Sequence, residues 1–446
     1  MRLVNTIKNI WKIEDLKKRI LTTATFVAVY LFGTHVVIPG VDPKMLSELT
    51  RQTSGGLMAL LDMFSGGAFS KASVFALGIM PYISASIVMQ LLTIAVPSFQ
   101  KMQREGESGR RKINQMTRYL TVAILLLQGS AYLANLGMQL RAAGSSLQSG
   151  LWFSLSSLVI MAGGSMFALW LGERITDKGI GNGISFIIMV GIINRLPQAL
   201  VQEFTSRMNE QAGGLVMFLL ELLLLLLVIC FAILLVQGTR KVPVQYAKRI
   251  VGNKQYGGAR QYIPLKVNAA NVMPIIFAQA IIMIPVSIVG MYKGGDMNPF
   301  WQSFMNTTGF WYNFIIALMV VAFTYFYTAI TINPTQMADD LKRNNGFIPG
   351  IKPGKATKEY LDTIMDRITL PGAFFLAIIA ILPAFARAAG VSMGFSQFFG
   401  GTSLLILVGV ILDTLQQVES HLLMRHYDGL LKSGRIKGRS GSVSAY

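Results

Sequence analysis

The chain has 446 residues, 52% of them hydrophobic, and carries a formal net charge of +19. Its single cysteine, Cys230, excludes a disulfide framework and a cysteine-ligated metal cluster, and its three histidines are too scattered for a zinc motif. A soluble protein this basic would be expected to bind nucleic acid. The positions of the charges relative to the apolar residues indicate a different reason for the excess.

Ten apolar stretches dominate the sequence, and each reaches or approaches the roughly 20 residues that a helix needs to cross the hydrocarbon core. They cover approximately residues 20–38, 73–95, 114–136, 151–172, 183–203, 214–236, 269–290, 313–332, 368–386 and 398–423. Of the 40 basic residues, 32 lie in the two ends and alternate gaps, and 8 lie in the intervening gaps. The positive-inside rule therefore predicts a polytopic membrane protein with both termini in the cytoplasm.

The amino-terminal segment, residues 1–19, is predicted to be cytoplasmic and amphipathic. Its basic run at 17–19 precedes a full-length span, and no small-residue cleavage site follows, so we do not interpret it as a signal peptide. Between the first two spans, the apolar run 57–65 is bracketed by glycine pairs. A helix of this length would measure only ~13 Å, too short to span. It either dips into the bundle from outside or lies on the outer leaflet.

The ten spans divide into two halves of five, residues 20–203 and 204–423, followed by a cytoplasmic tail at 424–446. An odd number of helices in each half inverts the second half in the membrane. Corresponding spans contain Pro81 and Pro274. Because proline removes a helical hydrogen bond, we expect both helices to kink there. Matched interruptions of this kind indicate a central pathway, although a routine packing kink is the alternative.

Polar chemistry within the spans is sparse. The charges that we identify there are Glu221, Asp413 and Glu419, and the midplane candidates are mostly Ser, Thr, Asn and Gln. This pattern argues against an ion-coupled secondary transporter. Because Asp413 alone could serve such a transporter, this class of protein stays open as the alternative. The Gly179–Gly183 run lacks the strand and Lys-Ser end of a nucleotide loop and is interpreted as the glycine-rich beginning of a span. No catalytic constellation is found, which disfavours a membrane-embedded enzyme.

Particular strings resemble the SecY family, the channel subunits of the bacterial protein-secretion translocon. They follow the family's order from the second span to the last: Ala76–Ser86, Glu105–Lys112, Gly179–Ser185, Pro264–Asn268, Asn333-Pro334, Phe347–Gly350 and Gly400–Ile406. The resemblance implies an all-α protein of ten transmembrane helices in two inverted five-helix halves. The halves would form a clamshell around an hourglass pore for unfolded polypeptide.

The resemblance also implies roles for particular residues. The pore ring falls on Ile79, Ile83, Ile184, Ile188, Ile276 and Ile406. Two pairs of these isoleucines are four residues apart, which places each pair on one helix face. A plug helix at about 57–67 includes Leu57, Leu60, Leu61, Met63 and Phe64. The lateral gate, through which signal sequences leave sideways, includes Pro81, Ser84, Ser86, Gln90, Gln128, Asn268 and Pro274.

The family further implies partners and a location. Two basic loops would receive the ribosome and the motor ATPase SecA through Arg240, Lys241, Lys248, Arg249, Lys254, Arg260, Lys342, Arg343, Lys352, Lys355 and Lys358. Lys352 departs from the arginine usual in the family and loses the bidentate fork. SecE-like and SecG-like small subunits, preproteins and membrane lipids are the other expected partners. We expect no cofactor and no metal, and we expect the chain in the bacterial plasma membrane.

Overall fold

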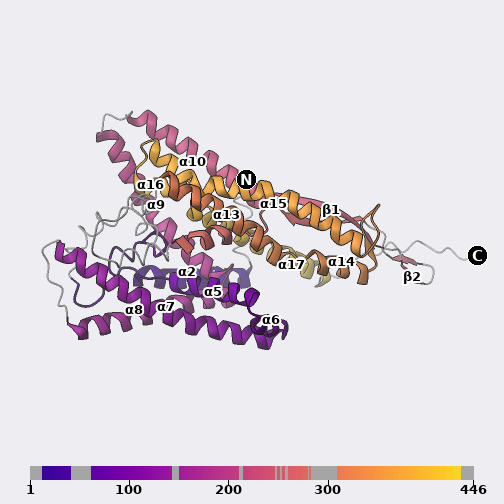
Figure 1. The fold of residues 1–446 in the computed structure, drawn as a ribbon, viewed down its shortest axis with the longest axis horizontal. Helices are drawn as coiled ribbons and strands as arrows, with labels where there is room; N and C mark the ends of the chain where they lie inside the picture. The colour runs from indigo at the N-terminus through magenta and orange to yellow at the C-terminus, as the bar shows by residue number, and fades with distance from the viewer. Residues whose placement is uncertain are drawn as a thin grey trace, which may run out of the picture.

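The computed structural model describes residues 13–41, 62–142, 150–209, 214–246, 249–251, 254–256, 260–279, 281–282 and 309–432. Long helices make up most of it, and they run roughly along the long axis of the molecule (Figure 1). The predicted polytopic, mainly helical fold class is confirmed. Helices from the two parts of the chain form two groups, drawn in purple to magenta and in pink to orange (Figure 1).

The amino-terminal group contains six helices among the described residues. They are α2 (Glu14–Gly33), α5 (Met80–Ala95), α6 (Pro97–Arg104), α7 (Glu107–Ala142), α8 (Leu151–Lys178) and α9 (Gly183–Asn209). Helix α9 begins directly after the Gly179–Gly183 run. A Cβ atom at Gly183 would lie 2.0 Å from the carbonyl oxygen of Gly172, so the turn from α8 into α9 requires glycine at this position.

The carboxy-terminal group begins with α10 (Gly214–Gln237) and includes a helical segment at 273–279. It continues with α13 (Phe310–Thr331), α14 (Pro334–Arg343), α15 (Lys355–Ala388), α16 (Met393–Ser396), the 3-10 turn η2 (Gln397–Phe399) and α17 (Gly401–Lys432). The Asn333 side chain caps α14 by accepting hydrogen bonds from the backbone N–H groups of Thr335 and Gln336, at 3.1 and 3.3 Å.

Seven helices in the described part of the chain are long and apolar enough to cross a membrane, and the bent pair α5–α6 gives an eighth candidate. Helix α2 is not among them, because five of its first six residues are charged and shorten its apolar part. The predicted seventh span lies partly outside the described residues. The count of ten spans therefore stays a prediction.

The expectation that Pro81 and Pro274 kink their helices is wrong. Pro81 occupies the first turn of α5, and Pro274 follows the first residue of the helical segment that starts at 273. The first turn has no intrahelical hydrogen bond for proline to remove, so each proline begins a helix. Residues 74–79, predicted to belong to the second span, consist of turns. The sharp bend of 102° lies instead between α5 and α6, at Val96 and Pro97.

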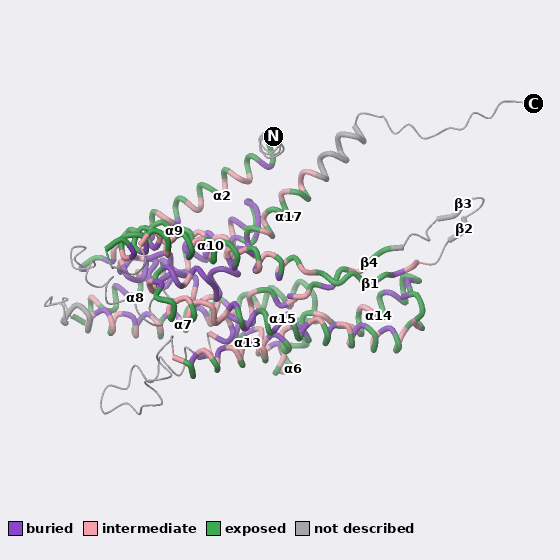
Figure 2. The backbone as a smooth tube through the Cα atoms, turned by 90° about the horizontal axis from the view of Figure 1, so that it is seen from above, coloured by how far each residue is buried: buried purple, intermediate pink, exposed green. Residues whose placement is uncertain are grey.

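A small sheet interrupts the helical plan. Strand β1 (Thr239–Tyr246) pairs antiparallel with β4 (Arg260–Lys266) and with β5 (Gly346–Phe347), giving the order β4-β1-β5. A second hairpin joins β2 (Arg249–Val251) and β3 (Lys254–Tyr256). Alternation places Val242 and Val244 on the buried face, where they pack with residues of α14 and α15. The two long basic loops thus form one domain, which extends from the helical body (Figure 2).

Candidate functional site

The six isoleucines assigned to the pore ring come from four separate parts of the chain. Ile188 of α9 and Ile406 of α17 are buried in one apolar cluster, and Ile83, Ile184 and Ile276 pack against that cluster. Ile79 lies in the adjoining cluster, to which Ile83 and Ile184 also contribute. The structure therefore brings the six side chains together at the boundary between the two helix groups. A constriction of branched apolar side chains excludes water and blocks ions.

The described part of the predicted plug, residues 62–67, lies against this cluster. Met63 and Phe64 are buried in the same cluster as Ile188 and Ile406. Residues 62–64 form a helical turn, and turns continue through residue 79 up to α5. Leu57, Leu60 and Leu61 lie outside the described residues, as does the beginning of the short helix predicted there. We refer to residues 62–79, which comprise the described part of the predicted plug and the residues between it and α5, as the plug segment.

Glycines allow the plug segment to touch the backbone of α9. Gly66 and Gly67 have φ angles of +69° and +88°, in the left-handed region that favours glycine. A Cβ atom at Gly66 would lie 3.0 Å from the Cα of Gly191. A Cβ atom at Gly191 would lie 3.2 Å from the backbone nitrogen of Gly66. A side chain at either position would push the segment away from the helix.

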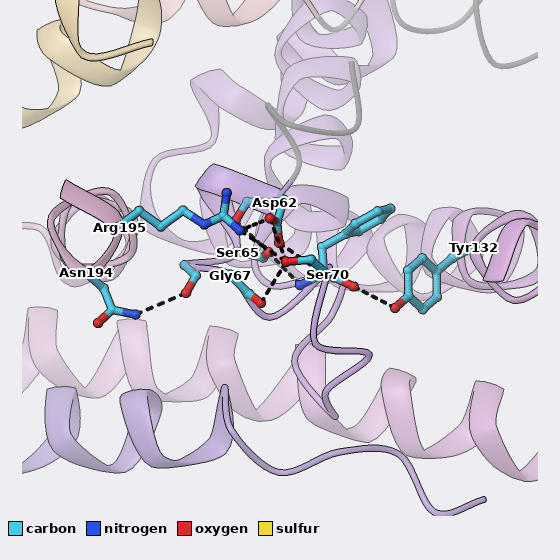
Figure 3. Close-up of polar contacts among 9 residues, drawn as sticks. Asp62, Ser65, Gly67, Ser70, Tyr132, Asn194 and Arg195 are labelled. Atoms are coloured by element: carbon cyan, nitrogen blue, oxygen red, sulfur yellow. Dashed lines mark hydrogen bonds and ion pairs between the residues drawn. The ribbon is translucent and has the colours of Figure 1, made fainter. Parts of the chain in front are cut away.

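An ion pair between the buried Asp62 and the partly exposed Arg195 fastens the plug segment to α9 (Figure 3). Asp62 is 2% exposed, and its carboxylate accepts from the backbone N–H of Ser70 at 2.8 Å and from the Ser70 hydroxyl at 2.7 Å. The guanidinium of Arg195 donates to the same carboxylate and, at 3.1 Å, to the Ser70 hydroxyl. The carboxylate therefore has partners for both of its oxygens, which makes its burial tolerable.

Three further hydrogen bonds hold the backbone of the plug segment. The Tyr132 hydroxyl of α7 donates to the carbonyl of Phe69 at 2.8 Å, and the Asn194 amide of α9 donates to that of Gly66 at 3.1 Å (Figure 3). The Tyr30 hydroxyl of α2 donates to the Ser65 carbonyl at 3.4 Å. The segment is thus anchored to three different helices of the amino-terminal group.

The residues assigned to the lateral gate are dispersed over several helices. Gln90 donates to the hydroxyl of Ser86 at 3.4 Å, one turn away on α5. Ser84 on α5 and Gln128 on α7 are both half-buried. Asn268 is 2% exposed, and neither of its amide atoms has a hydrogen-bond partner among the described residues. Ile83 of α5 and Ile276 of the helical segment 273–279 pack against the same apolar cluster.

The basic residues assigned to docking lie on the domain built around β1. Arg240 and Lys241 are exposed on β1, Lys342 and Arg343 end α14, and Lys352, Lys355 and Lys358 lie at and before the start of α15. Arg249, Lys254 and Arg260 are on strands β2, β3 and β4, and Lys248 lies outside the described residues. The sequence placed these residues in two separate loops. The pairing of Gln245 with Phe347 brings the two loops together.

Sequence reasoning missed the charges of α9, of which Glu203 and Arg207 are buried and Arg195 is partly exposed. Arg195, Glu203 and Arg207 all belong to this helix, yet only Glu221 was singled out in this region. Arg207 donates to Glu203 at 3.1 Å and to Glu221 of α10 at 2.5 Å. Asp62 inside the apolar run and Arg195 inside the apolar stretch 183–203 were the available signals, because a charge within an apolar segment needs a partner. In the described residues, no group of three or more His, Cys, Asp or Glu side chains could hold a metal ion.

Comparison with known proteins agrees with this geometry. The SecY family model matches residues 73–415. The translocase subunit SecY of Streptomyces galbus is 42% identical over 436 residues, covering 95% of this chain and 98% of the relative. That of Thermotoga maritima is 40% identical over 444 residues, covering 97% and 99%.

Solved structures show the same fold at lower sequence identity. A structure of a protein-conducting channel matches with a TM-score of 0.62 and 16% identity, covering 95% of each chain. Sec61 from a canine ribosome–channel complex matches with a TM-score of 0.58 and 15% identity, again covering 95% of each chain.

The long apolar helices, together with these matches, define a polytopic membrane channel. The chain belongs to the SecY family of protein translocase subunits. Its function is that of a protein-conducting channel, and the secondary-transporter alternative receives no support.

Proposed function

We propose that the structure represents the closed channel and that the six clustered isoleucines form its constriction. The observation that carries this proposal is the shared burial of Ile188 and Ile406 with Met63 and Phe64 of the plug segment. Apolar side chains from both helix groups seal the waist, and the plug segment covers it. A preprotein has to displace the plug segment and part the isoleucines. Because these side chains form no strong bond with a passing chain, they suit substrates of any sequence.

Conductance of the purified channel in planar bilayers tests the seal. Replacing Ile188 or Ile406 with Asn should wet the constriction and raise the resting ion current well above that of the original channel. Ile193→Asn on the same helix is the matched control, because Ile193 is 41% exposed and Ile188 only 6%. The control should stay near zero current. Near-zero current from both ring variants would remove these isoleucines from the constriction.

Signal sequences and transmembrane segments, we propose, leave sideways between two helix pairs, α5 with α7 and the helical segment 273–279 with α13. Phe277 stacks on Phe323 of α13 at 5.7 Å between ring centroids, which holds the second pair together. The proposed gate residues are Pro81, Ser84, Ser86, Gln90, Gln128, Asn268 and Pro274. Ile83 and Ile276 pack on one apolar cluster, so α5 and the segment 273–279 would separate without breaking an ion pair between described residues, which supports an exit here.

Crosslinking tests the exit. After Cys230 is replaced, cysteines at Ile83 and Ile276 should form a disulfide on oxidation, because both side chains pack on one cluster. The oxidised channel should fail to export preproteins, and reduction should restore export. A cysteine pair at Phe277 and Phe323 lies within one flank of the exit and serves as the control. Normal export through a fully crosslinked Ile83–Ile276 pair would rule out this exit.

We assign docking of the ribosome and of the motor ATPase SecA to the domain around β1. Exposed lysines and arginines on one folded surface support this, since an acidic partner such as ribosomal RNA is attracted by charge and releases counterions on binding. Two structural relatives, canine Sec61 and yeast Ssh1, are described in complex with the ribosome. SecE-like and SecG-like subunits, preproteins and membrane lipids complete the proposed partners. The proposed location is the bacterial plasma membrane, with both termini in the cytoplasm and without catalytic activity or cofactor.

A further inference from the structure

One face of α9 leads outward from the constriction and ends in a charge. Ile184, Ile188, Gly191 and Arg195 are spaced four, three and four residues apart, so they share one face of the helix. At 1.5 Å per residue, Arg195 lies about 10 Å beyond Ile188 along the helix axis. The contact of Gly191 with Gly66 shows that the plug segment covers this face in the closed state.

Among the described residues, the charge of Arg195 is neutralised only by the plug segment. Its ion-pair partner is Asp62, and its other hydrogen-bond acceptor is the Ser70 hydroxyl. The two buried charges of α9, Glu203 and Arg207, pair with each other, and Arg207 also pairs with Glu221. The nearby polar side chains of His35 and Lys71 contact each other. Within the described residues, therefore, no second carboxylate pairs with Arg195 once Asp62 has moved.

The two partners of this ion pair lie on parts of the channel that separate when a preprotein enters. Asp62 lies on the segment that we propose to be displaced by a preprotein, whereas Arg195 lies on a helix long and apolar enough to span the membrane. Displacement takes Asp62 and Ser70 away together and leaves the guanidinium on the wall of the path. A translocating chain then passes a fixed positive charge immediately after the constriction.

We propose that Arg195 discriminates between substrate charges in the open channel, favouring the passage of acidic segments and slowing basic ones. The proposal rests on displacement of the plug segment as set out above. A unit charge within about 5–10 Å in an aqueous path changes a passing charge's Boltzmann weight by about twofold to fourfold. The passage of each lysine or arginine of the substrate past Arg195 should be slowed by a factor of this order, and the passage of each carboxylate should be favoured.

Translocation of two matched preproteins tests charge discrimination by Arg195. The assay uses proteoliposomes that contain the complete channel complex and have no membrane potential. The preproteins differ only in a short run of glutamates or lysines, and their transit times give a ratio for each channel variant. The original channel should pass the glutamate form several-fold faster. Arg195→Gln should bring the ratio close to one, and Arg195→Lys, which keeps the charge, should preserve it. Raising the salt from about 0.1 M to about 1 M should shrink the ratio, because the screening length falls from about 10 Å to about 3 Å.

Asp62→Asn separates charge discrimination from fastening of the plug segment. This variant weakens the ion pair but keeps the guanidinium, so its transit ratio should equal that of the original channel. The proposal would be overturned if Arg195→Gln gave the same transit-time ratio as the original channel. It would also be overturned if Asp62→Asn lowered the transit-time ratio as much as Arg195→Gln does. Failure of the proposed plug displacement would give a different result. Asp62→Asn would then leave the transit times of both preproteins equal to those in the original channel.

Discussion

The buried charge cluster at the carboxy-terminal end of α9 gives the sharpest prediction for stability. Arg207 donates to Glu203, to Glu221 and, at 2.7 Å, to the carbonyl of Gly390. The second oxygen of Glu203 accepts from the backbone N–H of Ser392 at 2.8 Å. The cluster thus joins α9, α10 and the connection after α15, where the two parts of the chain meet. Replacing Arg207 with Met removes the guanidinium and keeps an apolar side chain of similar length.

The expected loss follows from the burial of the groups left behind. The side chains of Arg207, Glu203 and Glu221 are 8%, 1% and 4% exposed. Removing the only cation leaves two carboxylates facing each other out of water, and breaking a buried pair in this way costs about 3–5 kcal/mol. Glu221→Gln keeps an acceptor for Arg207 and leaves one carboxylate with one guanidinium, so it should cost about 1 kcal/mol or less.

Equilibrium unfolding in mixed micelles of dodecyl maltoside and SDS, followed by tryptophan fluorescence, measures these differences. Arg118→Met is the matched control, because its ion pair with Glu173 at 2.6 Å is 51% and 36% exposed and should contribute less than about 1 kcal/mol. Adding Glu221→Gln to Arg207→Met should recover part of the lost stability. The reasoning fails if Arg207→Met unfolds at the same SDS fraction as Arg118→Met, or if Glu221→Gln is the more damaging change.

Three other predictions concern the helix starts and the domain around β1. Pro81→Ala and Pro274→Ala should each change the unfolding free energy by less than about 1 kcal/mol, because first-turn prolines interrupt no helical hydrogen bond; a loss of several kcal/mol in the same micelle assay would contradict this. Val244→Asp places a charge in the core of the domain, where Val244 is 1% exposed, and should expose residues 239–266 to limited proteolysis while the spans insert normally. Unchanged protease resistance would refute that reading. Lys352→Glu should weaken binding of SecA or ribosomes to membranes and leave protease-protection topology intact, because the 32-to-8 bias barely changes. Full-strength binding would leave Lys352 with no docking role.

The sequence by itself determined the membrane character of the chain and its family, and it supplied the isoleucines that we propose for the constriction. Apolar stretches of about 20 residues identify spans because a helix rises by a fixed distance per residue and the hydrocarbon core has a fixed thickness. The spacing of Ile184 and Ile188 placed both on one face of α9 because helical periodicity is local. The family strings then selected these isoleucines from the many in the chain.

Tertiary structure alone decided which distant groups meet. Asp62 and Arg195 are 133 residues apart, and no local period relates an aspartate in a short apolar run to an arginine in a later span. The pairing of Gln245 with Phe347 is likewise invisible in two loops that each read as basic and solvated. The role of each proline depended on where its helix begins, and turns at 74–79 and 269–272 set that point. Short-range patterns fix the surface that each helix must bury, whereas the partner of a buried charge depends on how the buried surfaces pack together.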